Sequence, residues 1–379
     1  MTAAAVDHRF KTPTGGAAAV LRWPVRKKSS MGPLSSSAAI VPALRRTRNV
    51  LFRPFAAGTF FRIALAAVIA ESVVLNFRYV TPHLDFGDFS AVVRQAAEGS
   101  LHRSASIVLL GIAALALVDL LLLAWYAIIR LRFTVFHAVL CERPGLREGW
   151  RRYARPADKL FRATLLASFA NVALVGVLGG FIALGANTVF NVRTSDGKFD
   201  LGVFLLMFFP TIAFAATIAM AFVLTHVVLH DFILPHVALE DSTVREAWRA
   251  VRKRIRTDRE AFFSYFVLRV LFAIVAGPVL WVIGFAILWP VFWILGASAA
   301  GYNALLEDAA GWSEVFRISL NVVMLLLGAA VGAAAAGVIG GPLAVFLRAH
   351  AMYFYGSRYK ALGDLLEARA AEVVETESA

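Results

Sequence analysis

Long apolar runs alternate with arginine-rich segments along this chain, and that alternation constrains the fold more than any motif. The runs lie near residues 60–77, 105–129, 163–190, 201–229, 265–296 and 318–347. Each is long enough to cross about 30 Å of hydrocarbon at about 1.5 Å of helical rise per residue. A soluble core does not account for 59% hydrophobic residues together with a formal net charge of +13. The pattern therefore predicts an all-α, polytopic membrane bundle of about six transmembrane helices.

The distribution of positive charge predicts the orientation of this bundle. Short loops rich in Lys and Arg stay on the cytoplasmic side. The segment before the first apolar run, the loop after the second and the loop after the fourth are rich in arginine, whereas the intervening loops are poor in it. We therefore expect a multi-pass protein of the bacterial cytoplasmic (inner) membrane with both termini in the cytoplasm.

Three regions are expected along the chain. Residues 1–43 are predicted to be a disordered basic segment, 44–362 the polytopic transmembrane domain, and 363–379 an acidic cytoplasmic tail. Either Met1 or Met31 is the natural start.

The basic clusters also predict the partner. Each lies within a few residues of an expected helix end, where inner-leaflet phosphates are the nearest anions. This placement favours anionic phospholipid and disfavours nucleic acid, which would need a soluble domain or a basic face with stacking aromatics. A membrane protein partner is a further possibility. Cys141 is the only cysteine, so no disulfide framework and no thiolate metal cluster are expected.

Two segments share one order of residues and predict an internal repeat. From Arg132 and from Asp231, the chain runs through Phe, His, Leu and an acid to Arg-Glu-x-Trp-Arg, ending at Arg151 and Arg249. Each copy follows an expected inward span and precedes an outward one. We therefore predict parallel repeats, at about 105–190 and 201–296, around an axis along the membrane normal.

The second copy predicts an amphipathic helix. Thr243 and Glu246 form the pattern of a capping box. Val244, Trp248, Val251 and Ile255 then fall on one side of the helix, and cations occupy the rest; the first copy places Leu146, Trp150 and Tyr153 similarly. Two placements are expected for each helix: it lies on the inner leaflet, or it packs under the bundle. The two placements are compatible with each other. The predicted lipid-facing cations are Arg147, Arg151, Arg245, Arg249, Arg252 and Lys253, with Trp150 and Trp248 as interface anchors.

The chain resembles a known membrane family in these segments. The residues are the paired stretches from Arg132 and Asp231, the segment Arg48-Asn-Val-Leu-Phe-Arg-Pro-Phe55, and Tyr353-Phe-Tyr-Gly356. They are similar to the multi-helical membrane domain associated with bacterial glycerophosphoryl diester phosphodiesterases, over most of 40–367. In that family the chemistry belongs to a separate barrel domain of about 250 residues. The resemblance therefore implies a stand-alone relative of unknown function without a catalytic domain.

Several polar residues near or within the spans are candidate sites. Arg132 and Asp231 occupy equivalent repeat positions, so they are expected to pair at the inner mouth of the bundle or to be solvated there. Asp119 and Glu71 lie inside expected spans, where acids mark a transport path or bond to a neighbouring helix. His226, His230, His236 and Glu240 form an interface polar cluster, for which hydrogen bonding is favoured over metal binding. No catalytic residue, metal or cofactor is predicted.

Three function classes remain open. A non-enzymatic membrane protein that engages anionic inner-leaflet lipid or a partner through basic arms accounts for the features most simply. A transporter or channel component would use the repeat and Asp119. A lipid-processing membrane enzyme ranks third, because no nucleophile, base and oxyanion donors converge in the pattern.

Overall fold

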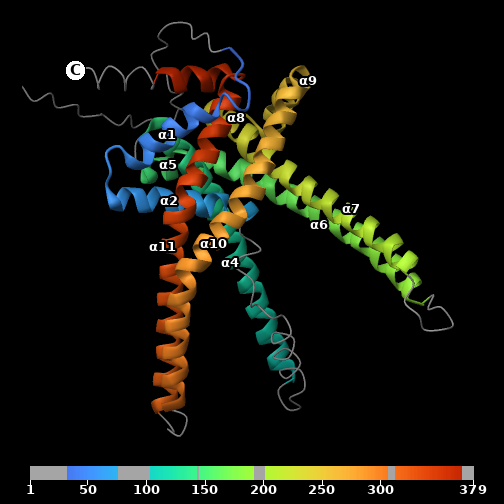
Figure 1. Cartoon of the computed structure of the whole chain (residues 1–379), viewed down its shortest axis with the longest axis vertical. Coiled ribbons are helices and arrows are strands. Elements are labelled where there is room, and N and C mark those ends of the chain that lie inside the picture. The colour runs from blue at the N-terminus through green and yellow to red at the C-terminus, as the bar shows by residue number, and fades with distance from the viewer. Residues whose placement is uncertain (1–31, 76–102, 143–144, 192–200, 306–311, 369–379) are drawn as a thin grey trace, which may run out of the picture.

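The computed structural model describes residues 32–75, 103–142, 145–191, 201–305 and 312–368 of the chain (Figure 1). This part of the chain is helical and contains no strand, as the sequence predicted. Its elements are α1 (Ile40–Phe52), α2 (Ala57–Leu75), α4 (Arg103–Cys141), α5 (Leu146–Arg152), α6 (Ala154–Asn191), α7 (Leu201–Val227), the π-helical turn η1 (Val228–Ile233), α8 (Leu234–Glu240), α9 (Val244–Thr257), α10 (Arg259–Leu305) and α11 (Trp312–Gly356).

Five stretches within the described helices are long and apolar enough to cross a membrane. They are Ala114–Cys141, Ala154–Val177, Phe208–Glu240, Arg259–Ser298 and Ser319–Gly356. They coincide with five of the six predicted runs, and they indicate an integral membrane protein. The predicted count of six is not confirmed, because the first run, near 60–77, is not among the five.

The helices form a base from which long legs diverge (Figure 1). We call α4, the α6/α7 hairpin and the α10/α11 hairpin the legs. The base consists of α1, α2, α5, α8 and the leg segments that pack against them. In Figure 1 the legs spread apart below the base, and α9 continues roughly in line with α10 on the opposite side. The predicted arm around Trp248 therefore projects from the base and does not lie across the legs.

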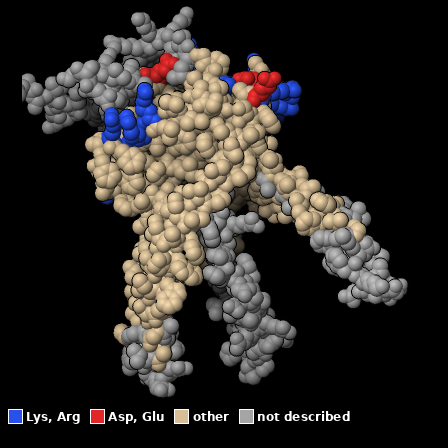
Figure 2. Space-filling model, viewed as in Figure 1, with Lys and Arg blue, Asp and Glu red and all other residues tan. Residues whose placement is uncertain are grey.

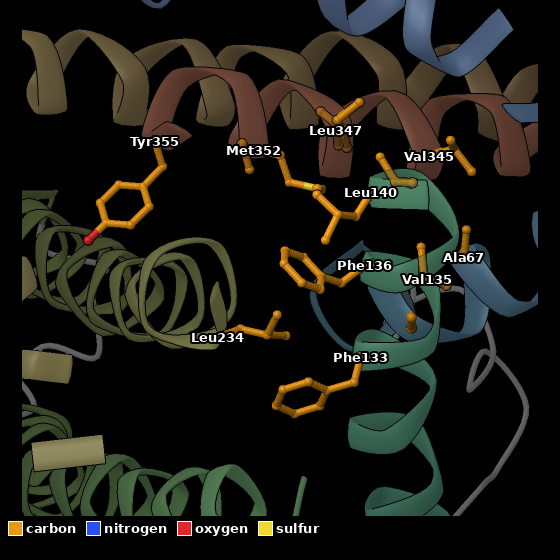
Figure 3. Close-up of a cluster of buried hydrophobic side chains, with 14 of the residues drawn as sticks. Ala67, Phe133, Val135, Phe136, Leu140, Leu234, Val345, Leu347, Met352 and Tyr355 are labelled. Atoms are coloured by element: carbon orange, nitrogen blue, oxygen red, sulfur yellow. The ribbon is translucent and has the colours of Figure 1, made fainter. Parts of the chain in front are cut away.

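The hydrophobic core lies in the base. Its buried side chains come from α1, α2, the last turns of α4, the start of α6, η1, α8, α9, the start of α10 and the end of α11. Figure 3 shows Ala67, Phe136, Leu140, Leu234 and Met352 from four of these elements around one interior. On the legs, large apolar side chains such as Leu123, Phe169 and Leu325 are more than 60% exposed. Exposed apolar surface on this scale fits contact with lipid and not with water.

Helix α2 crosses α11 at a set of glycines. A Cβ added to Gly341 would meet the Cβ of Ala64 and would lie 2.8 Å from its Cα, and one added to Gly340 would lie 3.1 Å from a methyl of Val68. These glycines let the two backbones approach closely. Figure 1 shows α2 running across α11 and not beside it. Over its described residues, the segment predicted as the first span is thus a helix of the base that packs across α11.

Part of each predicted end segment is ordered in the described chain. Residues 34–43 were expected to be disordered, but α1 begins at Ile40, and the carbonyl of Ser36 lies 2.8 Å from His350 Nε2. Similarly, 360–368 are helical and Leu366 is buried, although the acidic tail was expected from 363. The remaining residues of the two predicted end segments, 1–31 and 369–379, lie outside the described part.

Each leg is joined at the base by an ion pair. Arg46 of α1 pairs with Glu142 after α4 at 2.6 Å, Lys159 of α6 with Asp241 after α8 at 2.8 Å, and Asp258 before α10 with Arg358 after α11 at 2.8 Å. Glu142 and Asp241, which the predicted repeat aligns, both have φ of 51°. The two copies thus share a local turn, while the repeat as a whole stays a prediction.

Candidate functional site

A cluster of charged side chains is buried where the legs meet the base. It consists of Glu71 on α2, Arg132 on α4, Asp231 on η1, Arg269 on α10 and Arg348 on α11, and all five residues are less than 9% exposed. We call these residues the charge cluster. Five separate elements supply it, so folding of the whole base is needed to assemble it.

Two carboxylates hold two of the arginines in place. Glu71 Oε1 lies 2.6 Å from Arg348 Nη2, and Glu71 Oε2 lies 3.2 Å from Arg269 Nη2. Asp231 lies 3.7 Å from each of the same guanidinium groups and accepts a hydrogen bond of 2.8 Å from the Tyr265 hydroxyl. Buried charges that are linked in this way are costly to separate, because removal of one leaves its partner uncompensated.

Arg132 belongs to the charge cluster but is held differently. Its Nε donates to the carbonyl of Ala70 at 2.7 Å, and Glu71 and Asp231 both act on it electrostatically. Among the described side chains, Asp231 forms its ion pairs with Arg269 and Arg348 and not with Arg132. The predicted partners therefore lie in one cluster, as expected from the repeat, but they do not form the predicted direct pair.

A π-helical turn presents Asp231 to the charge cluster. In an α-helix the carbonyl of Asp231 would accept from the residue four positions later, which is Pro235 and has no N–H. The chain instead forms η1 over Val228–Ile233, just before α8. Single π turns of this kind are frequent at functional sites.

The predicted interface polar cluster separates into two pairs. His226 and His230 lie with ring centroids 4.5 Å apart, next to the charge cluster. His236 lies further along, with Nδ1 3.1 Å from Glu240 Oε2 and Nε2 2.8 Å from the Tyr355 hydroxyl. Its ring also lies over that of Tyr359, where burial raises the pKa of the Tyr359 phenol. His236 thus contributes hydrogen bonds, and His226 and His230 contribute a ring contact. The described residues hold no group of three or more His, Cys, Asp or Glu suited to a metal ion.

Asp119 lies away from the charge cluster. It is exposed on the part of α4 that forms a leg. Glu71, the other predicted intramembrane acid, lies at the centre of the cluster instead. The structure therefore groups Glu71 with Arg132 and Asp231, which the sequence had treated as separate candidates.

The two predicted arms differ in their packing. In α9 the capping box forms: the Thr243 side chain accepts from the Glu246 backbone, and the Glu246 carboxylate accepts from the Thr243 backbone. That backbone hydrogen bond lowers the pKa of Glu246. Trp248 is 42% exposed on α9, whereas on α5 the guanidinium of Arg130 lies 4.4 Å from the centre of the Trp150 ring. Trp248 is thus available as an anchor, and Trp150 is partly covered.

The predicted lipid-facing cations lie at the surface of α5 and α9. On α9 an open hollow of about 290 Å³ is lined by Arg249, Arg252, Lys253, Arg256 and Thr257. The exposed cations are Arg147, Arg151, Arg245, Arg249, Arg252 and Lys253. On the face seen in Figure 2, charged side chains gather on the base and the described surface of the legs is uncharged.

A further surface on α1 and α2 combines aromatic and basic side chains. Phe52, Phe55 and Phe61 are 42%, 62% and 42% exposed, and they pack with Phe60 at centroid distances of 5.5 to 6.0 Å. We call these rings, together with the exposed Arg45, Arg48, Arg53 and Arg62, the α1–α2 surface. The sequence pattern assigned this segment no surface role: residues 48–55 entered only as part of the family resemblance, and nothing in the pattern indicates that α2 lies across α11.

Sequence analysis also did not single out Arg269 and Arg348. Arg269 stands inside an apolar run and Arg348 directly follows one. Each is therefore an ionisable residue at membrane depth that needs a partner, like Glu71. A count of the charges in and next to the runs would have found all three residues, without showing which of them pair.

Comparison with known proteins identifies a family but no activity. The model of a family of unknown function, DUF7544, matches residues 34–365. No curated protein and no solved structure matches the chain. Nothing in these comparisons links the chain to glycerophosphoryl diester phosphodiesterases, so that resemblance stays a prediction.

Proposed function

Because this chain belongs to the DUF7544 family, whose function is unknown, we propose a function from its own surfaces: it is a non-enzymatic protein of the bacterial inner membrane that engages anionic phospholipid of the inner leaflet. The α1–α2 surface carries this proposal. Its exposed phenylalanines and arginines stand on the same two helices of the base, from which the apolar legs extend. Aromatic rings favour the membrane interface, and each arginine near anionic headgroups contributes about 1 kcal/mol.

The proposed orientation places the base in the cytoplasm. The legs then cross the membrane, and the α1–α2 surface lies at the level of the inner-leaflet headgroups. The cations of α5 and α9 extend the basic surface on the same side, where they attract anionic lipid or an acidic partner. Both ends of the described chain also lie at the base, since Leu34 accepts a hydrogen bond from Arg358 through its carbonyl. This arrangement supports cytoplasmic termini.

Depth-dependent fluorescence tests the proposal. Phe55→Cys in a Cys141→Ser background is labelled with a polarity-sensitive fluorophore in nanodiscs that contain brominated lipid. We expect quenching at Phe55→Cys and none at the control Lys360→Cys, which is exposed on the helical segment 360–368. Equal, weak quenching at both positions would contradict an interfacial α1–α2 surface.

Lipid selectivity provides the second measurement. Substitution of Arg45, Arg48 and Arg62 by Gln together should lower the enrichment of phosphatidylglycerol around the purified protein by about fivefold or more. The matched control is neutralisation of three exposed cations of α9: Arg249, Arg252 and Arg256. A larger loss of phosphatidylglycerol enrichment in the α9 variant would show that α9, and not the α1–α2 surface, makes the lipid contact.

A transporter is the second candidate, and the buried charge cluster favours it. Ionisable groups at membrane depth that link separate helices are common along ion and substrate paths. The test is solute flux in proteoliposomes. Flux that is abolished by Asp231→Asn and unchanged by Asp119→Asn would support a transporter over the lipid-binding function.

A further inference from the structure

Each arginine of the charge cluster carries a buried nitrogen without a hydrogen-bond partner among the described residues. These atoms are Arg132 Nη2, Arg269 Nη1 and Arg348 Nε. An unmade hydrogen bond at a buried group costs about 1–3 kcal/mol, and more when the group is charged. One such atom would be a local imperfection, but here the three atoms belong to arginines of one cluster that stand on three different helices.

The formal charge of the charge cluster also favours an anion, because positive groups outnumber negative ones. Three guanidinium groups face the two carboxylates of Glu71 and Asp231, which leaves one positive charge when the neighbouring histidines are neutral. All five side chains are buried. Since an uncompensated charge in the interior is unfavourable, an anion at this location would stabilise the protein.

The unpartnered acceptor next to these donors narrows the chemistry of that anion. Asp231 Oδ1 accepts no hydrogen bond from the described residues and lies 3.7 Å from Arg348 Nη1. It would repel a bare anion but would accept from a hydroxyl on the ligand. Guanidinium groups from three helices also suit the tetrahedrally arranged oxygens of a phosphate better than a carboxylate, whose two oxygens lie in one plane.

We propose that the charge cluster binds a single phosphate group, held by Arg132, Arg269 and Arg348, with Asp231 Oδ1 accepting from a hydroxyl of the ligand. Glu71 and Tyr265 act as positioning residues. Glu71 holds two of the guanidinium groups, and Tyr265 holds the other oxygen of Asp231. This site is separate from the α1–α2 surface, on which the proposed function rests.

The surroundings allow two sources of the phosphate. The charge cluster joins η1 to α10 and α11, and Figure 1 shows the α6/α7 and α10/α11 hairpins diverging below the base. A lipid headgroup would reach the cluster with its acyl chains along the exposed apolar faces of these hairpins, which include Phe222, Leu271 and Val275. Free phosphate would instead arrive from the cytoplasmic side.

A titration of the full-length protein distinguishes these sources. Delipidated protein is titrated with inorganic phosphate in phosphatidylcholine nanodiscs, and separately with phosphatidylglycerol, which carries both a phosphate and hydroxyls. Bound ligand is measured by native mass spectrometry and by the shift in melting temperature. We expect one phosphate per chain. Binding only of phosphatidylglycerol identifies a lipid site, and binding of inorganic phosphate identifies a site for a soluble anion.

Arg132→Gln is the main test variant, because Arg132 is not ion-paired to either carboxylate. We expect at least about tenfold weaker binding, as for loss of one charged hydrogen-bond donor. Arg132→Lys keeps the positive charge but loses the planar guanidinium group. Its affinity should therefore lie between those of wild type and Arg132→Gln. The control is Arg46→Gln, since Arg46 is equally buried but bonded to Val139, Leu140 and Glu142. Its affinity should stay within about twofold of wild type.

Two results would overturn the proposal. The first is wild-type protein that binds neither inorganic phosphate nor phosphatidylglycerol, a result that does not depend on the folding of any variant. The second is a folded Arg132→Gln protein that binds as tightly as wild type. Either result would leave the proposed lipid contact of the α1–α2 surface intact, since the fluorophore at Phe55→Cys reports on that surface independently.

Discussion

Gly341 shows how a single hydrogen atom decides the packing of the base. The close approach of α2 to α11 leaves no room for a Cβ at this position, because both Cα and Cβ of Ala64 stand in the way. We predict that Gly341→Ala destabilises the protein by about 1–3 kcal/mol, the usual cost of overpacking. The measurement is thermal or denaturant unfolding in detergent.

The matched control for this variant is Gly176→Ala. A Cβ on Gly176 has no neighbour within 4 Å, so the substitution should be neutral or slightly stabilising through helix propensity. Equal melting temperatures for Gly341→Ala and wild type would show that α2 does not cross α11 as described.

At the level of residues, the sequence located part of the charge cluster. Arg132 and Asp231 were recognised because the repeat aligns opposite charges, and Glu71 because an acid in an apolar run needs a partner. Their partners depend on the three-dimensional path of α10 and α11, on which one sequence carries little information. The pairing of Asp231 with Arg269 and Arg348 was therefore not predictable from spacing.

Among the elements, α9 depends most clearly on a local signal. Its capping box was predicted from Thr243 and Glu246 and is formed in the structure. Because the folded pKa of Glu246 is lowered, the stabilisation from its carboxylate is complete above the unfolded pKa of about 4.3. It is lost as the pH falls through the folded pKa. We predict that the protection of the first-turn amides of α9, measured as the exchange rate relative to the intrinsic rate at the same pH, is lower under acid than at neutral pH.

Variants of the capping box check the origin of this pH effect. Thr243→Ala should weaken the start of α9 by about 0.5–2 kcal/mol at neutral pH, as for other N-cap losses. Glu246→Gln keeps a side chain that can accept the same hydrogen bond but does not titrate. In this variant the protection of the first-turn amides should therefore be the same at acid and neutral pH, once the intrinsic pH dependence of exchange is removed. Lower protection under acid in Glu246→Gln would refute the role of the carboxylate.

Helix α2 shows the limit of prediction at this scale. Its apolar run has the length and hydropathy of a span, and no feature within it distinguishes a membrane-crossing helix from a helix of the base. The deciding contacts are with Gly337, Gly340 and Gly341 of α11, far along the chain. Helix existence was thus predictable here, whereas helix direction was not.

For the whole molecule, the proposed orientation can be tested with cysteine labelling. In a Cys141→Ser background, Arg147→Cys lies at the base and Gly301→Cys near the far end of the α10/α11 leg. We predict that a membrane-impermeant maleimide labels Gly301→Cys in intact cells with the outer membrane permeabilised, and Arg147→Cys only in inverted vesicles. The opposite pattern would place the base outside the cytoplasm.

The length of the legs links the molecule to the thickness of its bilayer. The apolar stretch Arg259–Ser298 contains 40 residues, and its part beyond Arg269 of the charge cluster forms about 40 Å of helix against about 30 Å of hydrocarbon. A helix this long relieves the mismatch by tilting, and the required tilt increases as the bilayer becomes thinner. Since the α6/α7 and α10/α11 hairpins diverge directly below the charge cluster, the gap between them would widen in thin membranes and narrow in thick ones.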